Sequence, residues 1–238
     1  NWKANGGTTS SNTDGSITST IQANTTAGFS IVTYTGTGAN ATVGHGLGVA
    51  PKMIIMKRRD SAQNWVVYQE EVGNNRQIFL NLTNAQTGTN SVYFNNTSPT
   101  TSVFSLGSDD YANASSGTYV AYCFAEVEGY SKFGSYIGNG NVDGAFVFTG
   151  FRPAFIMSKK TSGTGNWEMF DTTRDPINYS GKYILANSSD AEGDTGTNTA
   201  GHIFDILSNG FKLRNTNSDR NTNGGTYIYM AFAEAPFK

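Results

Sequence analysis

The chain of 238 residues contains one long segment twice, and this repeat constrains the fold more than any other feature. The stretch APKMIIMKRRDSAQNWVVY at 50–68 is followed by RPAFIMSKKTSGTGNWEMF at 152–170. Pro51 and Pro153 stand 102 residues apart (153 − 51), and the Asn-Trp pairs keep the same offset. A self-similarity of such long period predicts two related structural units.

The similarity continues beyond this window with a growing offset. YTGTG at 34–38 is followed by YIGNG 102 residues later, and NLTNA at 81–85 is matched by NSSDA 106 residues later. GTYVAYCFAE at 117–126 is matched by GTYIYMAFAE 108 residues later, which indicates small loop insertions in the second copy. We predict three parts: the end of a preceding repeat with a connecting and lead-in strand, and two sandwich domains, at residues 1–23, 24–129 and 130–238.

The first residues, NWKA, support this division. Trp2 stands in a position comparable to Phe124 and Phe232, which come near the ends of the two copies. We therefore interpret residues 1–4 as the tail of an earlier copy.

Composition favours an all-β fold. Charged residues are 14% of the chain, whereas Gly (28), Asn, Ser and Thr are abundant and suit tight turns. Each copy has about seven short β-branched or aromatic runs between turn signals, which predicts tandem antiparallel β-sandwiches, with a jelly roll as one form. In the first copy these runs are 29–34, 52–58, 64–69, 77–82, 91–94, 102–106 and 118–125.

The last strand of each copy alternates large and small residues. Because successive side chains face opposite sides of a sheet, we predict that the large side, with Tyr122 and Phe124, fills the core between the sheets. Cys123 lies on the small side and reads as a small apolar residue, and a single cysteine excludes an intramolecular disulfide.

The repeated window contains a tryptophan and a pair of cations. Trp65 and Trp167 each have an apolar i+2 neighbour, which favours a core position over the alternative of a sugar-stacking platform. The cations Lys57-Arg58 and Lys159-Lys160 end a strand, and we expect them to be solvated.

Charge and hydropathy exclude some partners. The net charge is −2 and no basic tract occurs, so nucleic acid and anionic membranes are poor candidates. The longest apolar run, YVAYCFA, is too short to cross a bilayer, so we expect no membrane insertion.

The residues do not indicate catalysis. The two histidines, His45 and His202, stand outside any hydrolase or metal motif. Carboxylates such as Glu70, Glu71, Glu168 and Asp171 are candidates for a glycosidase pair, but no spacing in the sequence pairs them. We expect a protein that is not an enzyme, with no catalytic residues and with ligand-binding residues that the pattern does not single out.

One loop, DRNTNGG, has the spacing of the first half of a calcium loop. Asp219, Asn221 and Asn223 offer side-chain oxygens in a D-x-N-x-N-G pattern, but Met230 stands where the bidentate glutamate belongs. The alternative is a polar hairpin turn ending in Asn-Gly. Calcium at these three residues is the one cofactor that we consider.

Several long strings together resemble a known family. GFSIVTYTGTG, APKMIIMKRRDSAQNWVVY, AYCFAEVEGYSKFGSYIGNGN, DGAFVFTGFRPAFIM and GGTYIYMAFAE are similar to a repeated domain of uncharacterised function from tailed bacteriophages, especially marine ones. The resemblance covers nearly the whole chain from Asp14 onward. It brings no catalytic residues with it.

The resemblance implies a structural protein of the virion surface, similar to a tail fibre. We expect attachment to a host-cell surface glycan or protein, contacts with other virion proteins, and a homo-oligomer such as a trimer. The alternatives are a spacer or decoration protein of the capsid or tail without a ligand and, less favoured, a polysaccharide depolymerase. Recognition should lie where the copies differ, in the loops around 70–76, 86–100, 107–116, 172–182, 191–202 and 214–224.

Overall fold

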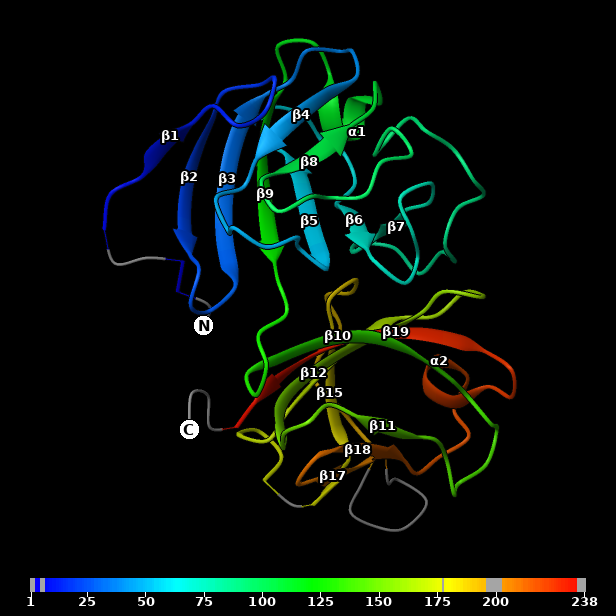
Figure 1. Ribbon diagram of the computed structural model, residues 1–238. Helices are drawn as coiled ribbons and strands as arrows, with labels where there is room; N and C mark the ends of the chain where they lie inside the picture. The colour runs from blue at the N-terminus through cyan, green and yellow to red at the C-terminus, as the bar shows by residue number, and fades with distance from the viewer. Residues whose placement is uncertain (1–2, 5–6, 177, 196–202, 235–238) are drawn as a thin grey trace. The chain divides into compact units, whose positions relative to one another are not determined.

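The computed structural model describes residues 3–4, 7–176, 178–195 and 203–234. It confirms an all-β fold in which every described ladder between named strands is antiparallel (Figure 1). The chain divides into two compact units. Unit 1 consists of Asn1–Leu80 and Gln86–Val127, and unit 2 consists of Asn81–Ala85 and Glu128–Lys238. The predicted lead-in stretch belongs to unit 1, and the NLTNA segment at 81–85 belongs to unit 2.

Unit 1 has one large and one small sheet, which enclose a core between them. The large sheet runs in the order β1 (Ser10–Asn12), β2 (Ser19–Asn24), β3 (Phe29–Thr35), β9 (Thr118–Phe124), β5 (Met53–Arg58), β6 (Val66–Gln69) and β7 (Ile78–Phe79). The small sheet consists of β4 (Ala41–Gly44) and β8 (Val103–Leu106), and a helical turn, α1 (Asp110–Asn113), precedes β9.

Unit 2 repeats this plan with a larger second sheet. Its first sheet runs in the order β10 (Ser131–Ile137), β19 (Thr226–Ala233), β12 (Pro153–Lys160), β13 (Trp167–Asp171), β15 (Lys182–Leu185) and β16 (Gly193–Asp194). The second sheet runs in the order β11 (Phe146–Phe148), β18 (Gly210–Leu213), β17 (Phe204–Leu207) and β14 (Tyr179–Ser180). The helical turn α2 (Ser218–Asn221) precedes β19, and no helix in the described ranges has the length and hydropathy to cross a membrane.

The side of the last strand that faces the core differs from the prediction. Tyr119, Ala121 and Cys123 belong to the core of unit 1, whereas Tyr122 and Phe124 lie on the opposite face. The small residues face inward because the ring of Tyr119 stacks on that of Tyr34, with centroids 5.1 Å apart, and the pair fills the space beside them. Unit 2 places its tyrosines in the same way.

The core position predicted for the tryptophans holds for Trp167, which is 1% exposed, but not for Trp65 of unit 1. In β6 the side chains in the core between the sheets are Val66 and Tyr68, and Trp65 lies on the other face, stacked on Tyr122 with a 6.5 Å centroid distance. Val67 shares the face of Trp65 and is nevertheless fully buried. Alternation therefore cannot identify the core side of this strand, because both of its faces are apolar and buried.

Two local predictions fail in unit 1. The run SVYF at 91–94 is a turn and not a strand, because Asn95 and Asn96 follow it with positive φ angles of 51° and 49°. Its aromatic residues, Tyr93 and Phe94, are nevertheless buried and belong to the core of unit 1. The strand β4 was missed because its sequence, ATVG, has only one large apolar residue.

Candidate functional site

The predicted calcium residues lie at α2, but their side chains do not converge. Asn221 is fully buried, and its amide nitrogen donates to the backbone oxygens of Asn141 and Asn215, both at 2.8 Å. Asp219 accepts a hydrogen bond from Asn166 at 2.9 Å, and Asn223 is exposed. Three residues with separate surroundings do not form an oxygen cage, and no cluster of His, Cys, Asp or Glu that could hold a metal occurs among the described residues.

The same arrangement in unit 1 explains why the asparagine is there. Asn113 is also fully buried, and its amide nitrogen donates to the backbone oxygens of Ala39 and Gly107 at 2.6 and 2.7 Å. Its amide oxygen accepts from the backbone N–H of Thr37 at 2.8 Å. In each unit one buried asparagine thus joins two loops to its own helical turn, and the pattern that resembles a calcium loop is part of the repeated scaffold.

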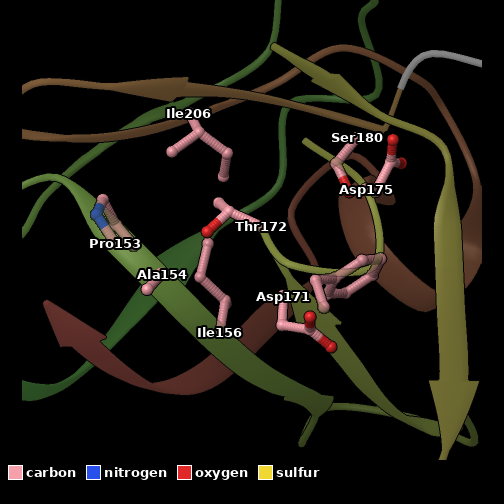
Figure 2. Close-up of a pocket in the computed structure, with 9 residues that line it drawn as sticks. Pro153, Ala154, Ile156, Asp171, Thr172, Asp175, Ser180 and Ile206 are labelled. Carbon is pink, nitrogen blue, oxygen red and sulfur yellow. The ribbon is translucent and has the colours of Figure 1, made fainter. Parts of the chain in front are cut away.

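A small pocket in unit 2 is a better candidate for a ligand site (Figure 2). The hollow measures about 220 Å³ when its open mouth is counted, but the space inside it that takes a water-sized group is only about 10 Å³. Its surface is almost entirely apolar, although two aspartates, a threonine and a serine belong to its lining residues. The lining residues are Pro153, Ala154, Ile156, Phe170, Asp171, Thr172, Asp175, Ser180 and Ile206.

Asp171 closes β13 and is the most constrained acid of this pocket. It accepts backbone hydrogen bonds from Thr173 and Arg174 and pairs with the Arg174 guanidinium, which also pairs with Glu192 at 2.8 Å. Partial burial raises the pKa of Asp171, but the hydrogen bonds and charge of Arg174 outweigh it, and the net pKa lies below the ordinary value. At neutral pH this carboxylate is a hydrogen-bond acceptor and not a proton donor.

Asp175 sets the far wall of the pocket. One of its oxygens accepts the backbone N–H groups of Gly181 and Lys182 at 2.6 and 3.0 Å, which fixes the chain as it enters β15. The pocket therefore has an apolar surface with fixed acceptors at its edge, but it is much smaller than the usual 300–1,000 Å³ of a small-molecule site. Its enclosed space of about 10 Å³ holds about one water molecule, so only a single small group of a ligand can enter it.

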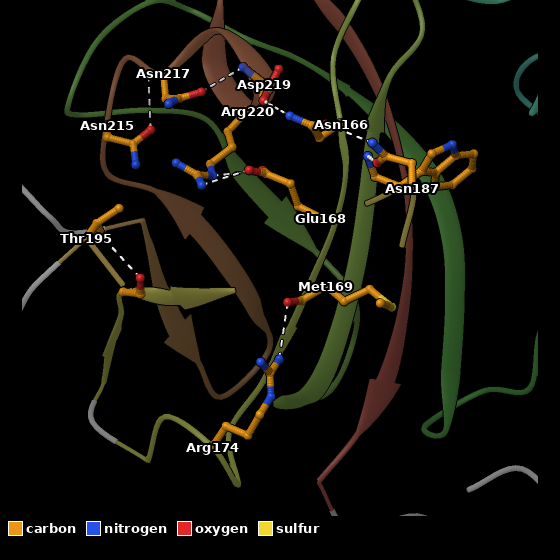
Figure 3. A network of polar contacts seen from close by, with 12 residues as sticks. Asn166, Glu168, Met169, Arg174, Asn187, Thr195, Asn215, Asn217, Asp219 and Arg220 are labelled. Carbon is orange, nitrogen blue, oxygen red and sulfur yellow. Dashed lines mark hydrogen bonds and ion pairs between the residues drawn. The ribbon is translucent and has the colours of Figure 1, made fainter. Parts of the chain in front are cut away.

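Next to the pocket lies a buried ion pair, Glu168 with Arg220 (Figure 3). Arg220 donates to both carboxylate oxygens of Glu168, at 2.8 and 2.7 Å, and each side chain is only 2% exposed. The guanidinium carbon lies 4.7 Å from the ring centroid of Tyr183, a cation–π contact. The aligned residues of unit 1 are Val66 and Ala112, both buried in its core.

A second polar chain ends at Asp219, the neighbour of Arg220 in the sequence. Asn187 donates to Asn166 at 2.8 Å, and Asn166 donates to Asp219, as Figure 3 shows. Lys159, which was expected to be solvated, is fully buried and donates to the backbone oxygens of Lys160 and of Thr83 in the 81–85 segment of the same unit. Burial lowers its pKa to about 8.

The remaining candidates have structural surroundings. His45 is buried, with its ring nitrogens at 3.2 Å from the oxygen of Thr100 and the N–H of Leu47, and burial lowers its pKa. Burial raises the pKa of Cys123 to about 12, which fits the predicted role of a small core residue. Trp2 and His202 lie outside the described residues.

Part of the lining of the pocket was predicted from the sequence. The loop around 172–182 was predicted as a recognition loop, and it supplies the polar side of the pocket. The apolar side comes from β12 and from Ile206 in β17, which the sequence did not connect with that loop. From the sequence, Glu168 was only a possible catalytic acid. A charged residue at a core position of β13 could have indicated a buried partner of opposite charge, which is Arg220.

Comparison with known proteins identifies the family. No curated protein and no solved structure matches the chain significantly. A family model described as a domain of unknown function (DUF7483) matches residues 1–236 and so includes both units. The chain therefore belongs to the DUF7483 family.

Proposed function

We propose that this chain is a surface module of a phage virion, of tail-fibre type, that attaches to a glycan on the host cell. The pocket of unit 2 supports this proposal, because its apolar surface is bordered by the side chains of two aspartates, a threonine and a serine. A sugar presents both C–H faces and hydroxyl donors, so its chemistry matches both this surface and its border. The resemblance to tail-fibre-like proteins gives the biological setting.

The location of the pocket supports the proposal as well. The two units share their sheets and their buried asparagine, but they differ between β7 and β8 in unit 1 and between β15 and β18 in unit 2. Unit 1 has no strand in this segment, whereas unit 2 adds β16 and β17, and Ile206 of β17 lines the pocket. A module that recognises a ligand differs from its scaffold copy in such connections.

A pocket-filling variant tests the proposal. The labelled chain, assembled as tetramers on streptavidin, is incubated with a panel of bacterial cells and with the same cells after enzymatic removal of surface polysaccharide. Tetramers are used because weak single-site binding gains strength from several copies. We expect binding to some cells, a loss of binding after glycan removal, and a loss of binding with Ala154→Trp, which fills the pocket.

Thr20→Trp is the matched control, because Thr20 is exposed on β2 of unit 1 and the change adds the same side chain away from the pocket. If both variants bind like the parent chain, the pocket is not the site. If no cell in the panel binds the tetramer, a spacer role replaces attachment. Release of reducing sugar from the cells would instead indicate a depolymerase.

A further inference from the structure

In unit 1, the outer edge of β4 is covered by a segment of the chain that precedes the first copy. This lead-in segment, Asp14–Ser19, runs beside β4. The N–H of Ile17 donates to the backbone oxygen of Thr42 at 3.0 Å, and the N–H of Thr42 donates to Oγ of Ser16 at 2.8 Å. The edge of the small sheet is therefore occupied by a third, strand-like segment.

The fit of the lead-in segment is close. A Cβ on Gly15 would lie 2.4 Å from the oxygen of Thr42, so only glycine permits this approach. A Cβ on Gly44 would lie 1.6 Å from Oδ1 of Asn12, so that side chain takes the space above β4. Ile17 is 7% exposed and belongs to the core.

Among its described residues, unit 2 has the counterpart of β4 but no segment that covers it. In β4 and β11 the central valine pairs with a buried phenylalanine of the neighbouring strand. This register places Phe146 at the position of Thr42 and Phe148 at the position of Gly44. Within the described residues, β11 is the end strand of its sheet and pairs with β18 only (Figure 1).

The two phenylalanines are exposed on this edge strand. Phe146 is 46% exposed and Phe148 is 61% exposed, and alternation places both on the same outer face. Natural edge strands are commonly protected by charges, proline or a covering segment. The sequence of β11, FVF, contains neither a charge nor a proline, and the covering segment of unit 1 has no described counterpart here.

We propose that the β11 edge of unit 2 is a docking site for one extended segment of another polypeptide, which adds to the sheet as the lead-in segment adds to β4. Backbone groups of Phe146 would pair with it, as those of Thr42 pair with Ser16 and Ile17. The incoming segment carries a serine or threonine next to Phe146, because the Oγ of Ser16 accepts the N–H of Thr42 in unit 1. It begins after the position of Asn12, because the ring of Phe148 takes that space.

The proposal is tested with a fluorescent peptide of residues 14–24, titrated with the full chain and followed by anisotropy. We expect saturable binding of one peptide per chain. The peptide with Ser16→Val should bind about two- to tenfold more weakly, because it lacks the hydroxyl oxygen that would accept the N–H of Phe146. A scrambled peptide should not bind.

Phe146→Pro locates the site. It removes an N–H that faces away from β18, a position where edge strands accept proline, so the fold should persist with unchanged circular dichroism. Phe146→Ser is its control, because it removes the ring and keeps the N–H. We expect binding at least tenfold weaker with Phe146→Pro and a smaller loss with Phe146→Ser.

A peptide N-methylated at the position of Ile17 provides a second measurement if Phe146→Pro misfolds, since it lacks the matching N–H, and it should not bind. Equal binding to parent chain and Phe146→Pro, or equal binding of the scrambled peptide, overturns the proposal. Absence of binding at 1 mM peptide also overturns it, because a dissociation constant of 1 mM corresponds to a binding free energy of only about −4 kcal/mol. Self-association of the chain that Phe146→Pro abolishes would show that a second copy occupies this edge, and would replace the partner proposed here.

Discussion

The buried pair of Glu168 and Arg220 gives the sharpest prediction for stability. In Arg220→Met the carboxylate of Glu168 stays at a position that is 2% exposed and loses both of its guanidinium donors. Breaking a buried pair from one side costs about 3–5 kcal/mol. Methionine keeps much of the arginine volume, so the loss reports the charge and not a cavity.

Unit 1 indicates the compensating change. It has Val66 and Ala112 at the aligned positions and buries both without a charge. Replacement of a buried ion pair by apolar residues of similar volume is often neutral or stabilising. The double variant Glu168→Leu/Arg220→Met should therefore be at least as stable as the parent chain.

Hydrogen exchange followed by mass spectrometry separates the two units. With a tenfold change for each 1.4 kcal/mol, amides of β12, β13 and β19 should exchange about a hundred- to four-thousandfold faster in Arg220→Met. Peptides of unit 1 serve as the internal control and should not change. If the double variant exchanges as fast as Arg220→Met, the charge argument is refuted and the residues act through shape.

The same variant has a pH dependence of known sign. Burial raises the pKa of Glu168 to about 7, and the charge of Arg220 opposes this shift. Without Arg220 the folded-state pKa is higher still, so the folded state binds the proton more tightly than the unfolded chain does. The stability of unit 2 in Arg220→Met should fall as the pH rises from about 4.5 through this raised pKa, and the deficit should be larger at pH 8 than at pH 5.

Three further predictions concern other buried groups. Asn221→Ala leaves one N–H and two carbonyls without their partner. At about 1–3 kcal/mol per group, this change should destabilise unit 2 by about 3 kcal/mol or more. Asn113→Ala should destabilise unit 1 alone by a similar amount, and hydrogen exchange distinguishes the two units. Since burial lowers the pKa of Lys159 to about 8, the folded state releases this proton before the unfolded chain does, so thermal stability should rise between pH 8 and 10.5, and Lys159→Met should abolish the rise. The thiol of Cys123 is fully buried with a pKa of about 12, so a thiol-reactive disulfide reagent should label it only after denaturant is added; rapid labelling of the native protein would contradict the structure.

Sequence patterns predicted the strands well where one strand has a strong apolar run. The runs at 29–34, 52–58 and 118–125 correspond to β3, β5 and β9. The patterns failed at 91–94, where buried aromatic residues belong to a turn that continues into two residues of positive φ. They also failed to predict which face of β9 points into the core, because both faces carry apolar residues and only the packing against other strands decides between them.

For the candidate site, the sequence predicted a polar loop but not the pocket. Asp171, Thr172 and Asp175 lie in or beside the loop that was predicted, and their approach to one another follows from chain proximity. Ile206 reaches the same pocket from β17, and its position depends on how the second sheet packs against the first.

The sequence by itself determined that the chain is all-β and that it is built from two related copies, because both properties follow from composition, alternation and self-similarity along the chain. The tertiary structure alone decided what each repeated position does. Val66 packs in the core of unit 1, whereas its counterpart Glu168 pairs with Arg220, 52 residues away in the sequence. The physical reason is that strand register and sheet packing, which bring distant residues together, set the surroundings of each side chain, and these surroundings determine whether a charge, a ring or an amide is stabilised there.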